Sequence, residues 1–96
     1  MKAQTQYELP FCNKWALWVS PDARDMNHLK RLDQQTLSRV LVFHPRNTQN
    51  LANALVSAIE SGNYESFTLR KGSIGHSDYW RVSTLAKKSG VILIWR

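Results

Sequence analysis

The chain has 96 residues, of which 43% are apolar, and this composition is typical of one small globular domain. Its 13 Lys and Arg residues outnumber its 7 Asp and Glu residues, and the formal charge of +6 favours an acidic partner. A single cysteine, Cys12, excludes an internal disulfide framework, and no apolar run reaches the roughly 20 residues that cross a bilayer.

The start of the chain is polar and contains no apolar stretch that could serve as a signal peptide. We therefore expect a cytoplasmic protein with no membrane partner. A single domain is expected over residues 1–96, with a leader at 1–12 and a folded core at 13–96. The leader shows no clear periodicity, and its apolar residues 9–12 either pack against the core or form part of an interface.

The basic residues are spread along the chain, with their excess in residues 70–96, where six Lys and Arg residues accompany one acid, Asp78. This distribution fits either a solvated basic face or a nucleic-acid footprint. No basic run is longer than two residues, and no nucleic-acid-binding motif accompanies them. A nucleic-acid partner is therefore the less favoured of the two interpretations.

The first predicted strand covers residues 15–19, five consecutive apolar residues that leave no polar face. Such a run indicates a strand covered on both sides, as in a parallel sheet. Ser20, Pro21 and Asp22 follow as a helix-start signal, in which the serine caps the free amides. The helix is expected within residues 22–32, where its apolar residues recur at three-residue steps: Met26, Leu29 and Leu32.

The same alternation of strand and helix continues to the end of the chain. After a connection at 33–36, we expect a strand at 40–43, a turn at 44–48 with Asn47 or Thr48 as cap, and a helix at 49–61 that ends at Gly62. A strand at 66–69 and a loop at 71–76 follow. The last helix begins at Ser77 and Asp78 and ends at Gly90, and the last strand covers residues 91–95. Four strands with three intervening helices predict an α/β domain with a mostly parallel sheet.

Residues that would carry catalysis or bind a cofactor are missing. The turn at 20–23 has no glycine and no lysine, and it places Asp22 where a nucleotide phosphate would bind. Cys12 and the three histidines, His28, His44 and His76, have neither catalytic nor metal-ligand spacing. We expect a binding module that is not an enzyme, with no cofactor and no metal.

Several segments resemble the SulA family, the SOS-induced inhibitors of bacterial cell division. Residues 14–21 (KWALWVSP) are similar to the family's first-strand motif, an aromatic-rich strand that runs into a Ser/Thr-Pro turn. Residues 39–42 and the helix over 54–64 are similar at the same spacing, and the step at 62–64 (Gly-Asn-Tyr) is the most distinctive match. Residues 77–96 continue the likeness more loosely.

The resemblance implies a RecA-like core without the phosphate-binding loop. It also implies that the chain binds the tubulin-like division protein FtsZ, on the surface that would receive the next subunit. Filament growth and septation would then stop by steric competition until DNA is repaired, with no bond made or broken. The family positions important for inhibition correspond to Lys14, Val19, Leu29 and Arg39.

The predicted positions of these four residues in the sheet indicate which of them can share one surface. Lys14 and Arg39 each precede a strand, so adjacent parallel strands would place both charges at one sheet edge, about 5 Å apart. Leu29 lies late in the intervening helix, which runs back toward that edge. Val19 lies at the other end of the first strand, some 17 Å from Lys14 at about 3.3 Å per residue.

The chain also departs from the family, which typically has a large aromatic residue at the position of Leu29 and arginine at that of Lys14. Both differences should weaken a binding hot spot. Compared with many members of the family, the leader is expected to be short and the C-terminal tail through which the family reaches the Lon protease is expected to be missing, so turnover by that protease is not expected. Two alternatives stay open: a basic nucleic-acid-associated domain, and an assembly domain that forms homodimers through apolar residues of the leader or an edge strand.

Overall fold

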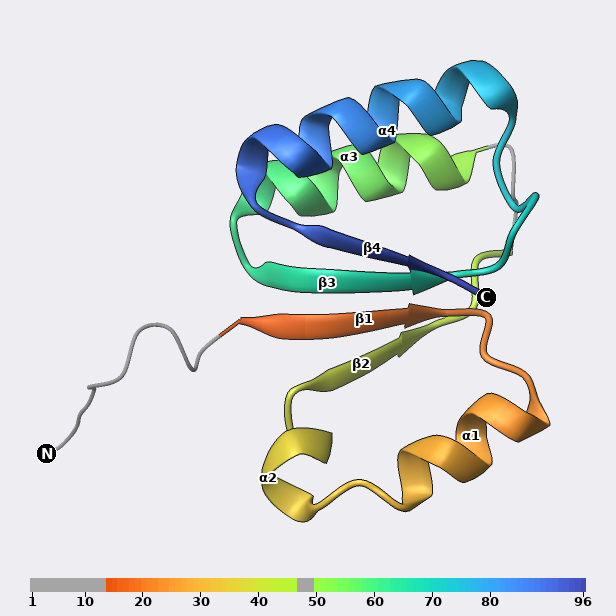
Figure 1. Ribbon diagram of the computed structural model, residues 1–96, viewed down its shortest axis with the longest axis vertical. Coiled ribbons are helices and arrows are strands. Elements are labelled where there is room, and N and C mark those ends of the chain that lie inside the picture. The colour runs from red at the N-terminus through yellow and green to blue at the C-terminus, as the bar shows by residue number, and fades with distance from the viewer. Residues whose placement is uncertain (1–13, 47–49) are drawn as a thin grey trace, which may run out of the picture.

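The computed structural model describes residues 14–46 and 50–96 and shows a parallel sheet with helices on both faces (Figure 1). The elements are β1 (Trp15–Val19), α1 (Ala23–Lys30), α2 (Gln34–Leu37), β2 (Val40–Phe43), α3 (Leu51–Ser61), β3 (Tyr64–Leu69), α4 (His76–Ser89) and β4 (Ile92–Trp95). The described strands lie in the order β2-β1-β3-β4, and every neighbouring pair is parallel. The predicted α/β class is confirmed.

The main core lies between the sheet and the layer formed by α3 and α4 (Figure 1). Alternate residues of the strands point into it, because side chains in a strand alternate between the two faces. Its buried residues are Leu17, Val19, Leu51, Ala52, Leu55, Ile59, Phe67, Leu69, Val82, Ala86 and Val91. Helices α3 and α4 are joined by Arg81, whose guanidinium group donates to Asn53 Oδ1 at 2.8 Å.

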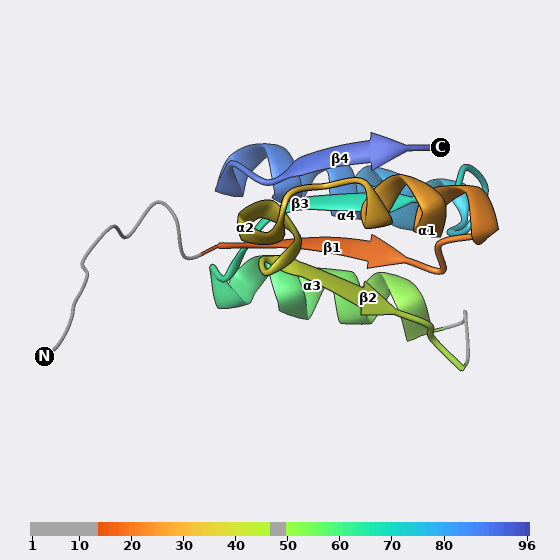
Figure 2. The ribbon, with the colours of Figure 1, turned by 90° about the horizontal axis from the view of Figure 1, so that it is seen from below.

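The opposite face carries the short helices α1 and α2. In Figure 2, which looks at this face, they lie over the middle of the sheet, and the strands at both of its edges, β2 and β4, stay in view. The exposed fractions are 43% for Val42, 63% for Ile92 and 44% for Ile94. The prediction that β1 is covered on both sides holds only in part, because Leu17 and Val19 are buried but Trp18 is half-buried.

The start of α1 differs from the prediction. Asp22, not Ser20, is the N-cap residue: the Asp25 backbone N–H donates to Asp22 Oδ1 at 2.8 Å, and the Asp22 N–H donates to Asp25 Oδ2 at 3.2 Å. This reciprocal arrangement satisfies two free amides at once. Ser20 instead adopts a left-handed conformation with φ of 50°.

A fourth helix, α2, lies where the sequence predicts only a connection. Asp33 caps it, accepting a hydrogen bond from the Thr36 backbone N–H at 2.7 Å. All four residues of α2 are exposed, so the helix buries no apolar face and its sequence shows no apolar periodicity. The capping residue Asp33 was therefore the only local indication of a helix.

The observed ends of the later helices and strands agree closely with those predicted from the sequence. Gly62 and Gly90 end α3 and α4 in the left-handed conformation, with φ of 74° and 76°. Helix α4 begins at His76, one residue early, and β3 begins at Tyr64, two residues early, where Tyr64 pairs with Trp15. The predictions for the leader, for Cys12 and for caps at 47–48 concern residues outside the described ranges. No described helix has both the length and the apolar character needed to cross a membrane.

Candidate protein-binding site

The amino ends of β1 and β2 bring Lys14 and Arg39 to one end of the sheet. The two strands are parallel neighbours, with Ala16 opposite Val40, and the Ala16 N–H donates to the Arg39 carbonyl at 2.8 Å. Lys14 is exposed and Arg39 is half-buried. Adjacent strands lie about 5 Å apart, so both cationic side chains start from the same corner of the molecule. We call Lys14 and Arg39 the basic corner.

One acidic residue belongs to the surroundings of the basic corner. Hydrogen bonding by Thr36 lowers the pKa of the Asp33 carboxyl group, and the charge of Arg39 lowers it further. Asp33 therefore stays ionised at neutral pH and offsets part of the positive charge that Arg39 presents.

Val19 and Leu29, the two apolar residues implied by the family resemblance, are both buried. Val19 is 4% exposed and belongs to the main core at the carboxyl end of β1. Leu29 is 3% exposed and lies on α1, on the other side of the sheet from α3 and α4 (Figure 1). The structure thus places Lys14 and Arg39 at the same end of the sheet, but it does not add Val19 or Leu29 to that surface.

The carboxyl end of the sheet holds a network of charged side chains that the sequence did not reveal. Arg70 follows β3 and contacts Asp22 at 2.9 Å and Asp25 at 3.7 Å, while its Nε donates to the Ser20 carbonyl at 3.1 Å. Arg96 follows β4, contacts the same Asp25 at 3.0 Å, and lies over the Trp18 ring at 5.5 Å. The Asp25 side chain is only 8% exposed.

This network occupies the place where an open α/β sheet normally binds its ligand, beyond the carboxyl ends of the strands. A phosphate there would meet two carboxylates, and the guanidinium groups nearest to it are already engaged by Asp22 and Asp25. Hydrogen bonding from Arg70 holds the pKa of Asp22 at about 2, so this carboxylate stays charged across the physiological range. The arrangement fits a closed sheet end rather than a nucleotide site.

No local pattern could have identified this network. Its acidic members share one helix start, where Asp22 and Asp25 form a recognisable capping pair, but Arg70 and Arg96 come from two other strands. Only the strand order, with β3 between β1 and β4, makes them neighbours.

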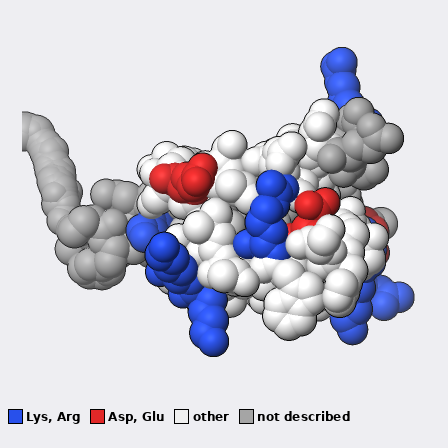
Figure 3. Space-filling model, turned by 90° about the horizontal axis from the view of Figure 1, so that it is seen from above, with Lys and Arg blue, Asp and Glu red and all other residues white. Residues whose placement is uncertain are grey.

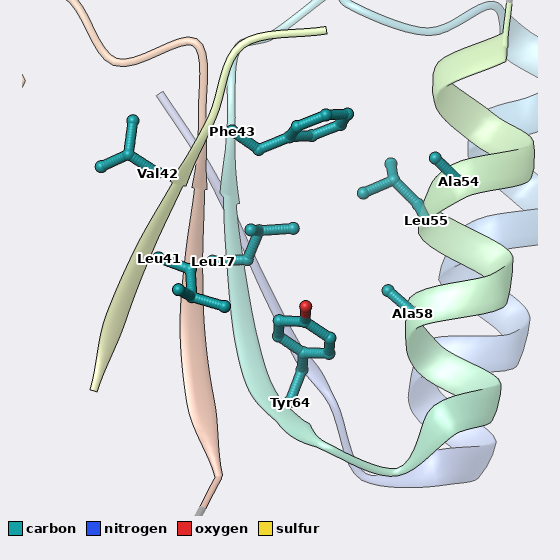
Figure 4. A pocket seen from close by; sticks show the side chains of 8 residues that line it. All are labelled: Leu17, Leu41, Val42, Phe43, Ala54, Leu55, Ala58 and Tyr64. Carbon is teal, nitrogen blue, oxygen red and sulfur yellow. The ribbon is translucent and has the colours of Figure 1, made fainter.

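An apolar groove runs along β2 between that strand and α3 (Figure 4). Its volume is about 320 Å³, and it is lined by Leu17, Leu41, Val42, Phe43, Ala54, Leu55, Ala58 and Tyr64. Figure 4 shows Leu17 and Phe43 pointing toward α3, whereas Val42 points away from it. The Tyr64 hydroxyl is the one polar side-chain group among these lining residues. The groove therefore suits an apolar side chain more than a charged ligand.

Charge is dispersed on the face formed by α3 and α4. Figure 3 shows Lys and Arg side chains at several places on this face, one of them beside an acidic group, rather than gathered in one patch. Within residues 14–46 and 50–96, no group of His, Cys, Asp or Glu side chains is arranged to hold a metal ion. The face formed by α3 and α4 therefore shows no continuous basic surface for a nucleic acid, and the described residues offer no candidate metal site.

These features define a small α/β domain whose sheet is closed at its carboxyl end and whose candidate sites are the basic corner and the apolar groove. A comparison with solved structures found a likeness to the crystal structure of SulA from Pseudomonas aeruginosa, with a TM-score of 0.65 and 16% sequence identity. The likeness covers 88% of this chain and 72% of that chain, and it confirms the expected SulA-like fold. No family model and no curated protein matches the sequence.

Proposed function

We propose that the chain is a SulA-like inhibitor of bacterial cell division, which binds FtsZ in the cytoplasm and blocks its polymerisation during the SOS response. The observation that carries the proposal is the likeness to the SulA crystal structure over 88% of the chain. The resemblance of residues 14–64 to the SulA family supports the same function.

The proposed mechanism is steric and not enzymatic. FtsZ filaments grow by stacking subunits, so a domain bound where the next subunit would dock stops growth without making or breaking a bond. The charged network at the carboxyl end of the sheet supports this mechanism, since it fills the usual ligand position with ion pairs.

We assign the partner contact to the basic corner, because Lys14 and Arg39 start from one end of the sheet and would face an acidic surface together. Val19 and Leu29 are buried and would affect inhibition indirectly. Val19 would hold β1 in the core, and Leu29 would hold α1 on the sheet. They support the surface rather than touch the partner.

GTP-dependent polymerisation of FtsZ, followed by light scattering, tests the proposal. We expect suppression at a near-equimolar ratio of the chain to FtsZ. Unaltered polymer at several-fold excess would reject the proposal. Salt-sensitive binding to DNA by a chain that leaves FtsZ unaffected would favour a basic nucleic-acid-associated domain instead.

The basic corner predicts the effect of one double substitution. Lys14→Ala with Arg39→Ala should raise the concentration needed for half-maximal inhibition by about tenfold or more, because two charge contacts are lost. Lys87→Ala with Lys88→Ala removes the same charge from the last turn of α4 and should leave inhibition unchanged. Circular dichroism checks that both variants fold. Equal inhibition by the two variants would contradict the assignment.

A second copy of the chain is a further partner that we propose, through β4. This strand is at the edge of the described sheet, and its residues Ile92 and Ile94 are 63% and 44% exposed. An open apolar edge invites pairing with another strand, and a two-fold axis would join two β4 strands into one continuous sheet.

Sedimentation equilibrium tests this dimer. Ile92→Lys should shift the protein toward monomer, whereas Val42→Lys, at the other edge strand, should not. A wild-type chain that stays monomeric at every concentration would contradict the dimer without touching the FtsZ proposal.

A further inference from the structure

The groove along β2 is an apolar surface that the described residues leave open. Leu41 and Phe43 line its strand side and are only partly buried, and Ala54 on α3 is exposed. Strand β2 pairs with β1 on one side, and no described strand pairs with it on the other. An open groove beside an edge strand is a place where an additional chain segment can bury apolar side chains.

The described part of the chain begins beside this groove. Tyr64 lines the groove and pairs with Trp15, so Lys14, the first described residue, lies near Tyr64. Residues 7–13 can span up to about 23 Å when extended, whereas the four residues of β2 span about 13 Å. The leader is therefore long enough to return along the whole groove.

The sequence of the leader supplies the matching chemistry. Tyr7, Leu9 and Phe11 alternate with Glu8 and Pro10, so an extended segment places its three large apolar side chains on one face. Three alternating positions are too few to predict a strand from sequence alone, but they match a groove of apolar lining. Proline is compatible with such an extended segment, because its fixed φ lies in the extended range.

We propose that residues 7–11 dock in the groove between β2 and α3, with Phe11 nearest Tyr64, Leu9 beside Leu41, and Tyr7 toward Phe43. The covalent link at Lys14 favours this occupant over a separate molecule, because a short flexible link gives an effective concentration in the millimolar range. The inference concerns the chain's own fold and is independent of the proposed function.

Methyl-resolved NMR of the full chain tests the inference. We expect nuclear Overhauser effects from the Leu9 methyl groups to the Leu41 and Ala58 methyl groups, and from the Phe11 ring to the Tyr64 ring. Leu9→Asp should abolish them, shift the Ala58 and Leu41 resonances, and lower the melting temperature. Glu8→Gln, on the other face of the segment, is the matched control and should do none of this.

Two results would overturn the inference. The first is a Leu9→Asp variant in which the groove resonances match those of the wild type. The second is contacts that appear only between labelled and unlabelled chains in a mixed sample, which would assign the groove to a second copy.

Discussion

At the scale of single residues, Arg70 organises the carboxyl end of the sheet. It contacts the carboxylates of Asp22 and Asp25, and it donates to the carbonyl of Ser20, a residue held at φ of 50°. A left-handed non-glycine residue persists only where its surroundings fix it. The hydrogen bonds that Ser20 makes, its carbonyl with Arg70 and its N–H with Phe43, supply that restraint.

The same ion pair predicts an acid dependence of stability. The hydrogen bond from Arg70, together with that from the Asp25 backbone N–H, lowers the pKa of Asp22 from 3.8 to about 2, so the unfolded chain binds a proton between about pH 4 and pH 2 that the folded chain does not. The stabilisation by this pair is complete above about pH 4 and disappears as the pH falls toward 2.

Asp22→Asn isolates this effect, because asparagine keeps the N-cap oxygen but cannot ionise. Urea unfolding of both proteins at several pH values is the measurement. Wild type should be the more stable at pH 7, and the difference should shrink between pH 4 and pH 2. A difference that stays constant across this range would contradict the assignment.

At the scale of elements, α1 has one buried apolar side chain, that of Leu29. Leu29 is 3% exposed, whereas most other residues of this helix are exposed. The capping pair at Asp22 fixes the start of the helix, and Leu29 anchors its later turns. An effect of Leu29 on inhibition would therefore come through the position of α1.

Leu29→Ala should lower the free energy of unfolding by about 2–5 kcal/mol, since it leaves a cavity under α1. Leu29→Met conserves volume and should cost less than about 1.5 kcal/mol. Urea unfolding measures both values. A Leu29→Ala variant as stable as the wild type, but unable to inhibit FtsZ, would show that Leu29 contacts the partner directly.

Most elements could be predicted because their apolar residues follow a clear period. The five-residue apolar run of β1 and the i, i+4 pattern of α3 fixed their type, and Gly62 fixed the end of α3. Helix α2 was missed because its residues are exposed and carry no period. The partners of Asp25 were missed because Arg70 and Arg96 become its neighbours only through the strand order.

At the scale of the whole molecule, the two ends of the sheet have opposite characters. The carboxyl end is closed by paired charges from three segments, the start of α1 and the ends of β3 and β4, whereas the amino end presents Lys14 and Arg39 at the starts of neighbouring strands. The sheet edges add the groove along β2 and the exposed apolar residues of β4. The proposed contacts with FtsZ, with a second copy and with the leader each use one of these surfaces.

Sedimentation of FtsZ polymer with increasing amounts of the chain tests the central claim of steric occlusion most directly. A blocking subunit that caps one FtsZ molecule should lower the pelleted FtsZ in proportion to the amount added, until little polymer remains near an equimolar ratio. A pellet that stays constant over the whole titration would contradict the account.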